Sequence, residues 1–197
     1  LTLGFGIGAT TAIFSVVNGV LLRPLPYAEP ERLVRVHEFV PRFGRFSVAP
    51  ATFLDWRAQN RTLEYVAAYS GTSGTLMGPD GPERVSGASV SADIFAVLGA
   101  QPALGRTFSA EEDAPGRGDV IVLSHGLWER RFGADPDVVG TSVSMNGTPV
   151  TIAGVMPESF YFPSRTAEFW RPLALNPANA TRGGHFLGVV GAHAPHH

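Results

Sequence analysis

Ser124 and His125 are adjacent and are of the residue types that serve as nucleophile and base in hydrolases. A nucleophile and its base must meet across space, and adjacent residues on a helix point in different directions. No Gly-x-Ser-x-Gly sequence surrounds any serine of the chain. We therefore interpret Ser124 as the N-cap of a helix and predict no catalytic residue.

Carboxylates and histidines supply the other candidates. Glu111-Glu112-Asp113 has the chemistry for a cation or for acid–base work, but the turn residues that follow favour a solvated loop. Asp135-Pro136-Asp137 fits a turn or a capped helix start. His193, His196 and His197 have metal-like spacing on a Pro-containing terminus, where we expect only adventitious metal affinity.

Cofactor sites are not indicated elsewhere. The chain has no Cys, which excludes a disulfide scaffold, a thiolate nucleophile and Cys-ligated metal. Gly4-Phe5-Gly6-Ile7-Gly8-Ala9 fits a loose dinucleotide fingerprint, but no strand precedes it and the first acid, Glu29, follows two prolines. The sequence therefore predicts neither a bound cofactor nor a metal site.

Composition bounds the class of protein. The chain has 197 residues, of which 44% are apolar and 16% charged, so it suits one compact domain or two small ones. Its net charge of −2 gives no dominant basic patch, and we expect no nucleic-acid partner.

Residues 1–22 contain no charged side chain and would form a helix about 33 Å long, enough to cross a bilayer. A buried helix of a soluble core is the alternative. Small and polar residues follow steps of four and three along one helical face, where a second helix could approach closely. This predicted packing face consists of Gly4, Gly8, Thr11, Ser15 and Asn18.

The remaining chain predicts an α+β pattern. Alternating or apolar runs indicate strands over residues 33–39, 63–69, 84–90 and 119–123. Helices are expected over residues 50–60, 91–99 (capped by Ser91 and ended by Gly99) and 124–131. Asn146-Gly147 lies between two alternating runs, 141–145 and 148–155, and predicts a two-residue hairpin.

Large side chains give weaker signals. We expect Trp56, Trp128 and Trp170 to anchor the core or its subdomains. Arg57, Arg106 and Arg131 fit either buried ion pairs or solvated positions, and the sequence leaves both open.

Several blocks follow one another in a fixed order that resembles the MacB-like, FtsX-type ABC permease family, especially its duplicated orphan-permease branch. The blocks are Leu21-Leu22-Arg23-Pro24-Leu25-Pro26-Tyr27, Phe53-Leu54-Asp55-Trp56-Arg57, Leu98-Gly99, Pro102-Ala103-Leu104-Gly105-Arg106-Thr107-Phe108, Glu111-Glu112-Asp113, Leu123-Ser124-His125-Gly126-Leu127-Trp128-Glu129-Arg130-Arg131-Phe132-Gly133, Asn146-Gly147 and Gly154-Val155-Met156-Pro157.

The resemblance implies a domain organisation. Residues 1–22 would be a transmembrane helix, residues 23–29 a Pro-rich connector and residues 30–104 a porter-like βαβ part of an extracytoplasmic core domain. Residues 105–175 would be an inserted mixed sheet-and-helix module. Residues 176–197 would be a truncated return segment, so the resemblance also implies a frameshift or an incomplete gene model.

The implied function is that of a permease fragment in the bacterial inner membrane, with residues 23–197 on the periplasmic side. Such a domain transmits conformational change or docks partners for export and is not itself catalytic. The implied partners are other permease helices or a second permease unit, periplasmic proteins, and a separate cytoplasmic ATPase that alone would bind ATP. The alternatives are a stand-alone membrane-anchored interaction module and, third, a hydrolase.

Overall fold

The computed structural model describes residues 30–42, 44–78 and 80–193. The predicted membrane helix 1–22, its packing face of Gly4, Gly8, Thr11, Ser15 and Asn18, and the connector 23–29 lie outside the described residues. None of the helices within the described ranges is long and apolar enough to cross a membrane.

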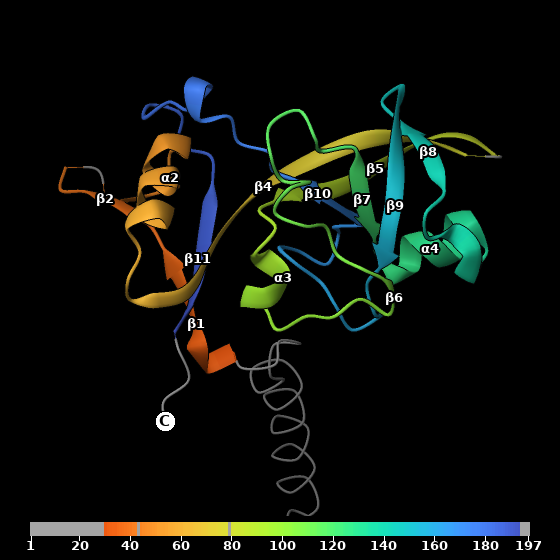
Figure 1. The fold of residues 1–197 in the computed structure, drawn as a ribbon, viewed down its shortest axis with the longest axis horizontal. Helices are drawn as coiled ribbons and strands as arrows, with labels where there is room; N and C mark the ends of the chain where they lie inside the picture. The colour runs from red at the N-terminus through yellow and green to blue at the C-terminus, as the bar shows by residue number, and fades with distance from the viewer. Residues whose placement is uncertain (1–29, 43, 79, 194–197) are drawn as a thin grey trace, which may run out of the picture.

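One mixed sheet forms the framework of the described chain (Figure 1). Its path is β1-β11-β4-β5-β10-β7-β9-β6, and β8 pairs with both β9 and β4. The strands are β1 (Leu33–Val36), β4 (Leu63–Gly78), β5 (Gly81–Val90), β6 (Leu104–Gly105), β7 (Val120–Leu123), β8 (Ser142–Met145), β9 (Thr148–Val155), β10 (Phe169–Pro172) and β11 (Gly188–His193). The pairs β5–β10 and β7–β9 are parallel, and the other pairs are antiparallel. The expected mixture of helices and strands is confirmed.

The remaining elements are short. Three α-helices, α2 (Pro50–Gln59), α3 (Ile94–Val97) and α4 (His125–Phe132), are described, together with the 3₁₀ turns Pro30–Arg32, Pro136–Val138 and Pro177–Asn179. A separate hairpin consists of β2 (Glu38–Val40) and β3 (Gly44–Phe46). The predicted helix at 50–60 is confirmed as α2, with Pro50 in its first turn.

A split βαβ unit occupies one end of the sheet. The chain runs from β1 through α2 to β4, and β11 lies between the two strands and pairs antiparallel with each. The strands β1 and β4 are therefore parallel to one another, as in other split βαβ folds. Phe53 of α2 packs with Val48, Leu187 and Val189 in a buried cluster, which fixes the helix against this part of the sheet.

The hairpin of β4 and β5 is much longer than predicted. The strands expected at 63–69 and 84–90 extend to meet at Gly78 and Gly81, with pairing continuous from Tyr69 opposite Val90. Glycine, serine and threonine dominate residues 70–75, and this composition hides the strand from a hydropathy pattern. Pairing with β5 supplies the stabilisation that local propensity lacks.

Two other sequence predictions are wrong in extent. The strand expected over 33–39 breaks at His37, and its second part pairs with β3 instead of entering the main sheet. The helix expected over 91–99 is only the single turn of α3. Ser91 does not cap it, because its buried Oγ accepts a hydrogen bond from the Ala68 backbone N–H at 3.0 Å.

Other local predictions are confirmed. Every residue of β7 is buried, and β8 and β9 form the predicted hairpin with Asn146 and Gly147 at φ 52° and 81°. Gly99 adopts the left-handed conformation expected after a helix. Trp170 is fully buried and its indole N–H donates to the Phe162 carbonyl at 2.7 Å.

One sheet contains strands from before and after residue 105 of the sequence. In β10, Phe169 pairs in register with Gly87 of β5, so the chain after residue 105 returns to the strands that precede it. An ideal Cβ at Gly87 would overlap the Phe169 backbone and ring, which makes glycine necessary at this contact. The segment 188–193 returns as β11 at the other end of the sheet.

Candidate functional site

Ser124 and His125 do not form a catalytic pair. The Ser124 Oγ accepts the Leu127 backbone N–H at 3.2 Å, which confirms its prediction as the N-cap of α4. The His125 ring lies edge-on to Trp128, and its Nδ1 is 3.3 Å from a Glu129 carboxylate oxygen. Both side chains line a pocket of about 310 Å³. Ser124 therefore caps α4, and the contacts of His125 are with Trp128 and Glu129 of the same helix, so the two side chains are not arranged as nucleophile and base.

The expectation of a solvated loop at 111–113 is wrong for Asp113. Its two carboxylate oxygens accept backbone N–H groups of Ala92 at 3.1 Å and Ala174 at 2.8 Å. Burial is the largest cause of the raised pKa of Asp113, and these hydrogen bonds oppose it. Asp113 therefore ties the segment after β5 to the segment after β10. Two backbone donors brought together by the fold require an acceptor there.

Glu112 is also engaged. Both of its oxygens accept hydrogen bonds from the Arg106 guanidinium, at 2.7 and 2.8 Å, and the Ser109 N–H donates at 2.8 Å. The hydrogen bond from Arg106 is the main cause of the lowered pKa of Glu112. Within the described residues, no group of three or more His, Asp or Glu side chains is arranged to hold a metal ion.

The other singled-out residues have structural contacts. Asp135 accepts the Asp137 N–H at 2.9 Å and caps the 3₁₀ turn Pro136–Val138. Of the two alternatives predicted for residues 135–137, the structure therefore has the capped helix start. Trp128 donates its indole N–H to the Asp135 carbonyl, whereas Trp56 is half-buried beside the α2 cluster. His193 ends β11, and its carbonyl accepts from Arg32 Nε at 2.7 Å. His196 and His197 lie outside the described residues.

The structure shows which of the three arginines left open by the sequence are solvated and which is buried. Arg57 pairs with Asp93 at 2.9 Å and Arg106 pairs with Glu112, both at half-exposed or exposed positions. Arg131 is different, since its side chain is only 8% exposed. Its buried guanidinium lies at the tip of the β4–β5 hairpin, where it contacts Gly81.

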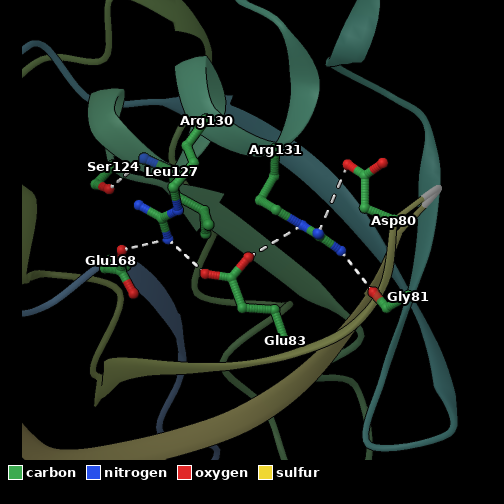
Figure 2. Close-up of polar contacts among 8 residues, drawn as sticks. All are labelled: Asp80, Gly81, Glu83, Ser124, Leu127, Arg130, Arg131 and Glu168. Atoms are coloured by element: carbon green, nitrogen blue, oxygen red, sulfur yellow. Dashed lines mark hydrogen bonds and ion pairs between the residues drawn. The ribbon is translucent and has the colours of Figure 1, made fainter.

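Figure 2 shows how α4 holds this tip. An Nη of Arg131 donates to the Gly81 carbonyl at 2.7 Å, and Arg131 Nε lies 3.2 Å from Glu83, an ion-pair contact without hydrogen-bond geometry. Asp80 adds a looser ion pair at 3.9 Å. An ideal Cβ at Gly78 would overlap the Arg131 guanidinium, so the hairpin approaches α4 as closely as glycine permits.

Arg130 extends the same contact to a second strand region. One Nη donates to Glu83 at 2.8 Å and to Glu168 at 2.7 Å, and the Glu168 bond is the largest cause of the raised pKa of Arg130. Glu168 directly precedes β10. We name Arg130 and Arg131 with Gly81, Glu83 and Glu168 the α4 clamp. The clamp joins α4 to both β5 and the start of β10.

Other residues of the sequence block 123–133 begin, bury and end the helix α4. Ser124 caps the helix, Leu127 is fully buried in the core, and Gly133 ends the helix at φ 62°. The sequence did not indicate Glu83 and Glu168 as partners of these arginines. The adjacent arginines signalled a need for acceptors, but their partners lie 38 and 47 residues away and only the sheet brings them together.

The family described as MacB-like periplasmic core domain matches residues 1–189. The chain belongs to the MacB-like periplasmic core domain family. No curated protein sequence is significantly similar to it.

Solved structures share the fold of this MacB-like domain. A domain of a putative permease from Porphyromonas gingivalis superposes with a TM-score of 0.64 at 15% identity, covering 86% of this chain and 78% of that one. The extracellular domain of the noncanonic ABC-type transporter YknZ from Gram-positive bacteria gives 0.59 at 15%, covering 83% and 84%. The periplasmic region of MacB from Actinobacillus actinomycetemcomitans gives 0.56 at 17%, covering 82% and 72%.

Proposed function

We propose that this MacB-like domain is the periplasmic part of an ABC-transporter-type permease in the inner membrane and that it carries conformational change outward or docks partners for export. Its membrane partners would be further permease helices or a second permease unit. A separate cytoplasmic ATPase would supply ATP hydrolysis, and the domain itself would bind no cofactor and catalyse no reaction.

The observation that carries this proposal is the continuity of β4. Sixteen residues long, it spans about 50 Å and belongs to both ends of the sheet. Its first half pairs with β11, and its second half pairs with β5 and contacts β8 at Leu76. A displacement applied at the β1–β11 end therefore reaches the hairpin tip through one paired strand.

The α4 clamp supports the same role. A hairpin that extends beyond its neighbours bends easily unless its tip is held, and here Arg131 fixes the tip to α4 through the Gly81 carbonyl. The buried side chains Leu76, Val85 and Leu127 pack beneath it in one cluster. Close packing transmits displacement because such cores have low compressibility.

Distances between spin labels test the proposal directly. The native chain has no Cys, so Gln59→Cys on α2 and Glu129→Cys on α4 give defined labelling positions. In the assembled permease with its ATPase, we expect the Gln59–Glu129 distance to stay constant when ATP is added. The distance between the Glu129 positions of two permease units should change.

The two possible failures differ. A changing distance within the domain would contradict a stiff transmitting body. Constant distances both within and between units would contradict transmission as a whole. Labelling of Glu111→Cys with a membrane-impermeant maleimide in intact spheroplasts tests the periplasmic location separately, and protection of that exposed position would contradict it.

A further inference from the structure

The β2–β3 hairpin carries an unusual exposed surface. Five large apolar side chains are exposed among the described residues, and three of them lie on this hairpin or on the segment beside it. These three are Phe39 at 68%, Phe46 at 37% and Phe186 at 53% exposure. The hairpin projects beyond α2, at the end of the molecule away from α4 (Figure 1).

One face of the hairpin is anchored. Glu38 accepts the Ala49 backbone N–H at 2.9 Å, and its other oxygen is 3.3 Å from His185 Nδ1. Phe46, which is opposite Glu38 in the register, contacts the His185 ring at a centroid distance of 5.9 Å. These contacts hold the two strands on the body of the domain.

The opposite face is open. Phe39 pairs in register with Arg45, so the two side chains lie on the same face of the strands. Arg42 lies in the turn between the strands and is also exposed. Within the described part of the chain, neither arginine has an acidic partner. An anchored hairpin thus presents an aromatic ring beside the positive charge of Arg45, and its turn carries a second positive charge, Arg42.

We propose that this face, which carries Phe39 and Arg45 next to Arg42 in the turn, docks a periplasmic protein whose surface has carboxylates beside an apolar pocket. Aromatic and Arg side chains are the types that contribute most to protein interfaces. The anchored strands lower the ordering cost of binding. A second copy of this chain is disfavoured, since symmetric contact would bring like charges together.

This proposal rests on the proposed function, because it names the partner chemistry of the same domain. Photo-crosslinking in the full-length permease in cells tests it. A benzoylphenylalanine at position 39 should form an adduct with a periplasmic protein, mapped to a peptide that contains Asp or Glu. The same probe at Met77, which is 46% exposed on β4, is the matched control and should not form that adduct.

Charge reversal then tests the electrostatic part. Arg45→Glu should reduce the adduct at least tenfold, and changing the mapped carboxylate of the partner to Lys should restore it. Since Arg45 is exposed, thermal unfolding of the variant should match that of the native chain. Restoration by the charge swap is a readout that a merely unfolded variant would not give.

Four results would overturn the proposal: an adduct with a second copy of the chain, an adduct with phospholipid only, an unchanged adduct in Arg45→Glu, or no adduct at position 39. The spin-label distances between permease units are independent of these results. Loss of the docking proposal would therefore leave the transmission proposal standing, and the reverse also holds.

Discussion

Asn146 and Thr75 exchange two hydrogen bonds across 71 residues of sequence. The Thr75 N–H donates to Asn146 Oδ1 at 2.8 Å, and the Asn146 N–H donates to the Thr75 carbonyl at 2.9 Å. The turn of one hairpin thereby continues the pairing along the edge of another, where Leu76 also pairs with Met145. The distal half of β4 is thus held by the β8–β9 hairpin as well as by α4.

Substitutions at Asn146 separate its role as a hydrogen-bond acceptor from its role as a residue at positive φ. Asn146→Ala should lower the free energy of unfolding by about 2 kcal/mol, because it loses the acceptor and strains a residue at positive φ. Asn146→Gly keeps the backbone freedom and should lose about half as much. Asn146→Asp keeps an acceptor and should stay near the native value. Urea denaturation measures all three, and a Gly variant as stable as the native chain would show that the side-chain bond contributes nothing.

The buried guanidinium of the α4 clamp is expected to be more important for stability than its exposed neighbour. Arg131→Met should lower the free energy of unfolding by about 2 kcal/mol, because it leaves the Gly81 carbonyl without its donor and removes the ion-pair contact with Glu83. Arg130→Met, at a 47% exposed position, should cost about 1 kcal/mol or less.

Arg117 provides the control for both arginines, since it is exposed and is not part of the α4 clamp. Arg117→Met should change the unfolding free energy by less than about 0.5 kcal/mol. Equal losses in the Arg130 and Arg131 variants would contradict the ranking by burial.

The lowered pKa of Glu112 predicts that the stability of the fold falls in acid. Its pKa is lowered in the fold, so its contribution to stability is present above its ordinary pKa of 4.5 and is lost as the pH falls through the lower folded value. Between about pH 5 and pH 3, the native chain should lose stability more steeply than Glu112→Gln. Arg106→Gln should reduce the slope in the same way, since the Arg106 hydrogen bond is the main cause. Parallel slopes in all three proteins would exclude this pair as the source.

The packing face predicted for residues 1–22 has its own test. Gly8→Leu should weaken helix association in a membrane two-hybrid assay, because a large side chain prevents close approach. Ile13→Leu, off the face of Gly4, Gly8, Thr11, Ser15 and Asn18, is the matched control and should leave association unchanged. Undiminished association of the Gly8 variant would contradict the face.

The sequence alone predicted features whose hydrogen bonds close within a few residues. Ser124 reaches Leu127 three positions on, Gly99 takes the left-handed conformation after its helix, and Asn146-Gly147 reverses the chain between adjacent strands. Such contacts depend on local backbone geometry and residue type. The ordered blocks also led to the MacB-like family, which the family comparison confirms over residues 1–189.

Only the tertiary structure decided features that depend on distant partners. The second half of β4 is a strand because β5 and β8 pair with it, not because its glycine-rich sequence favours one. Asp113 is half-buried where two backbone donors converge on it, and the Arg131 side chain is buried where the hairpin tip reaches α4. Phe39 is exposed since its strand leaves the main sheet at His37. These outcomes follow from free energies of pairing and burial between segments far apart in sequence, which no local pattern records.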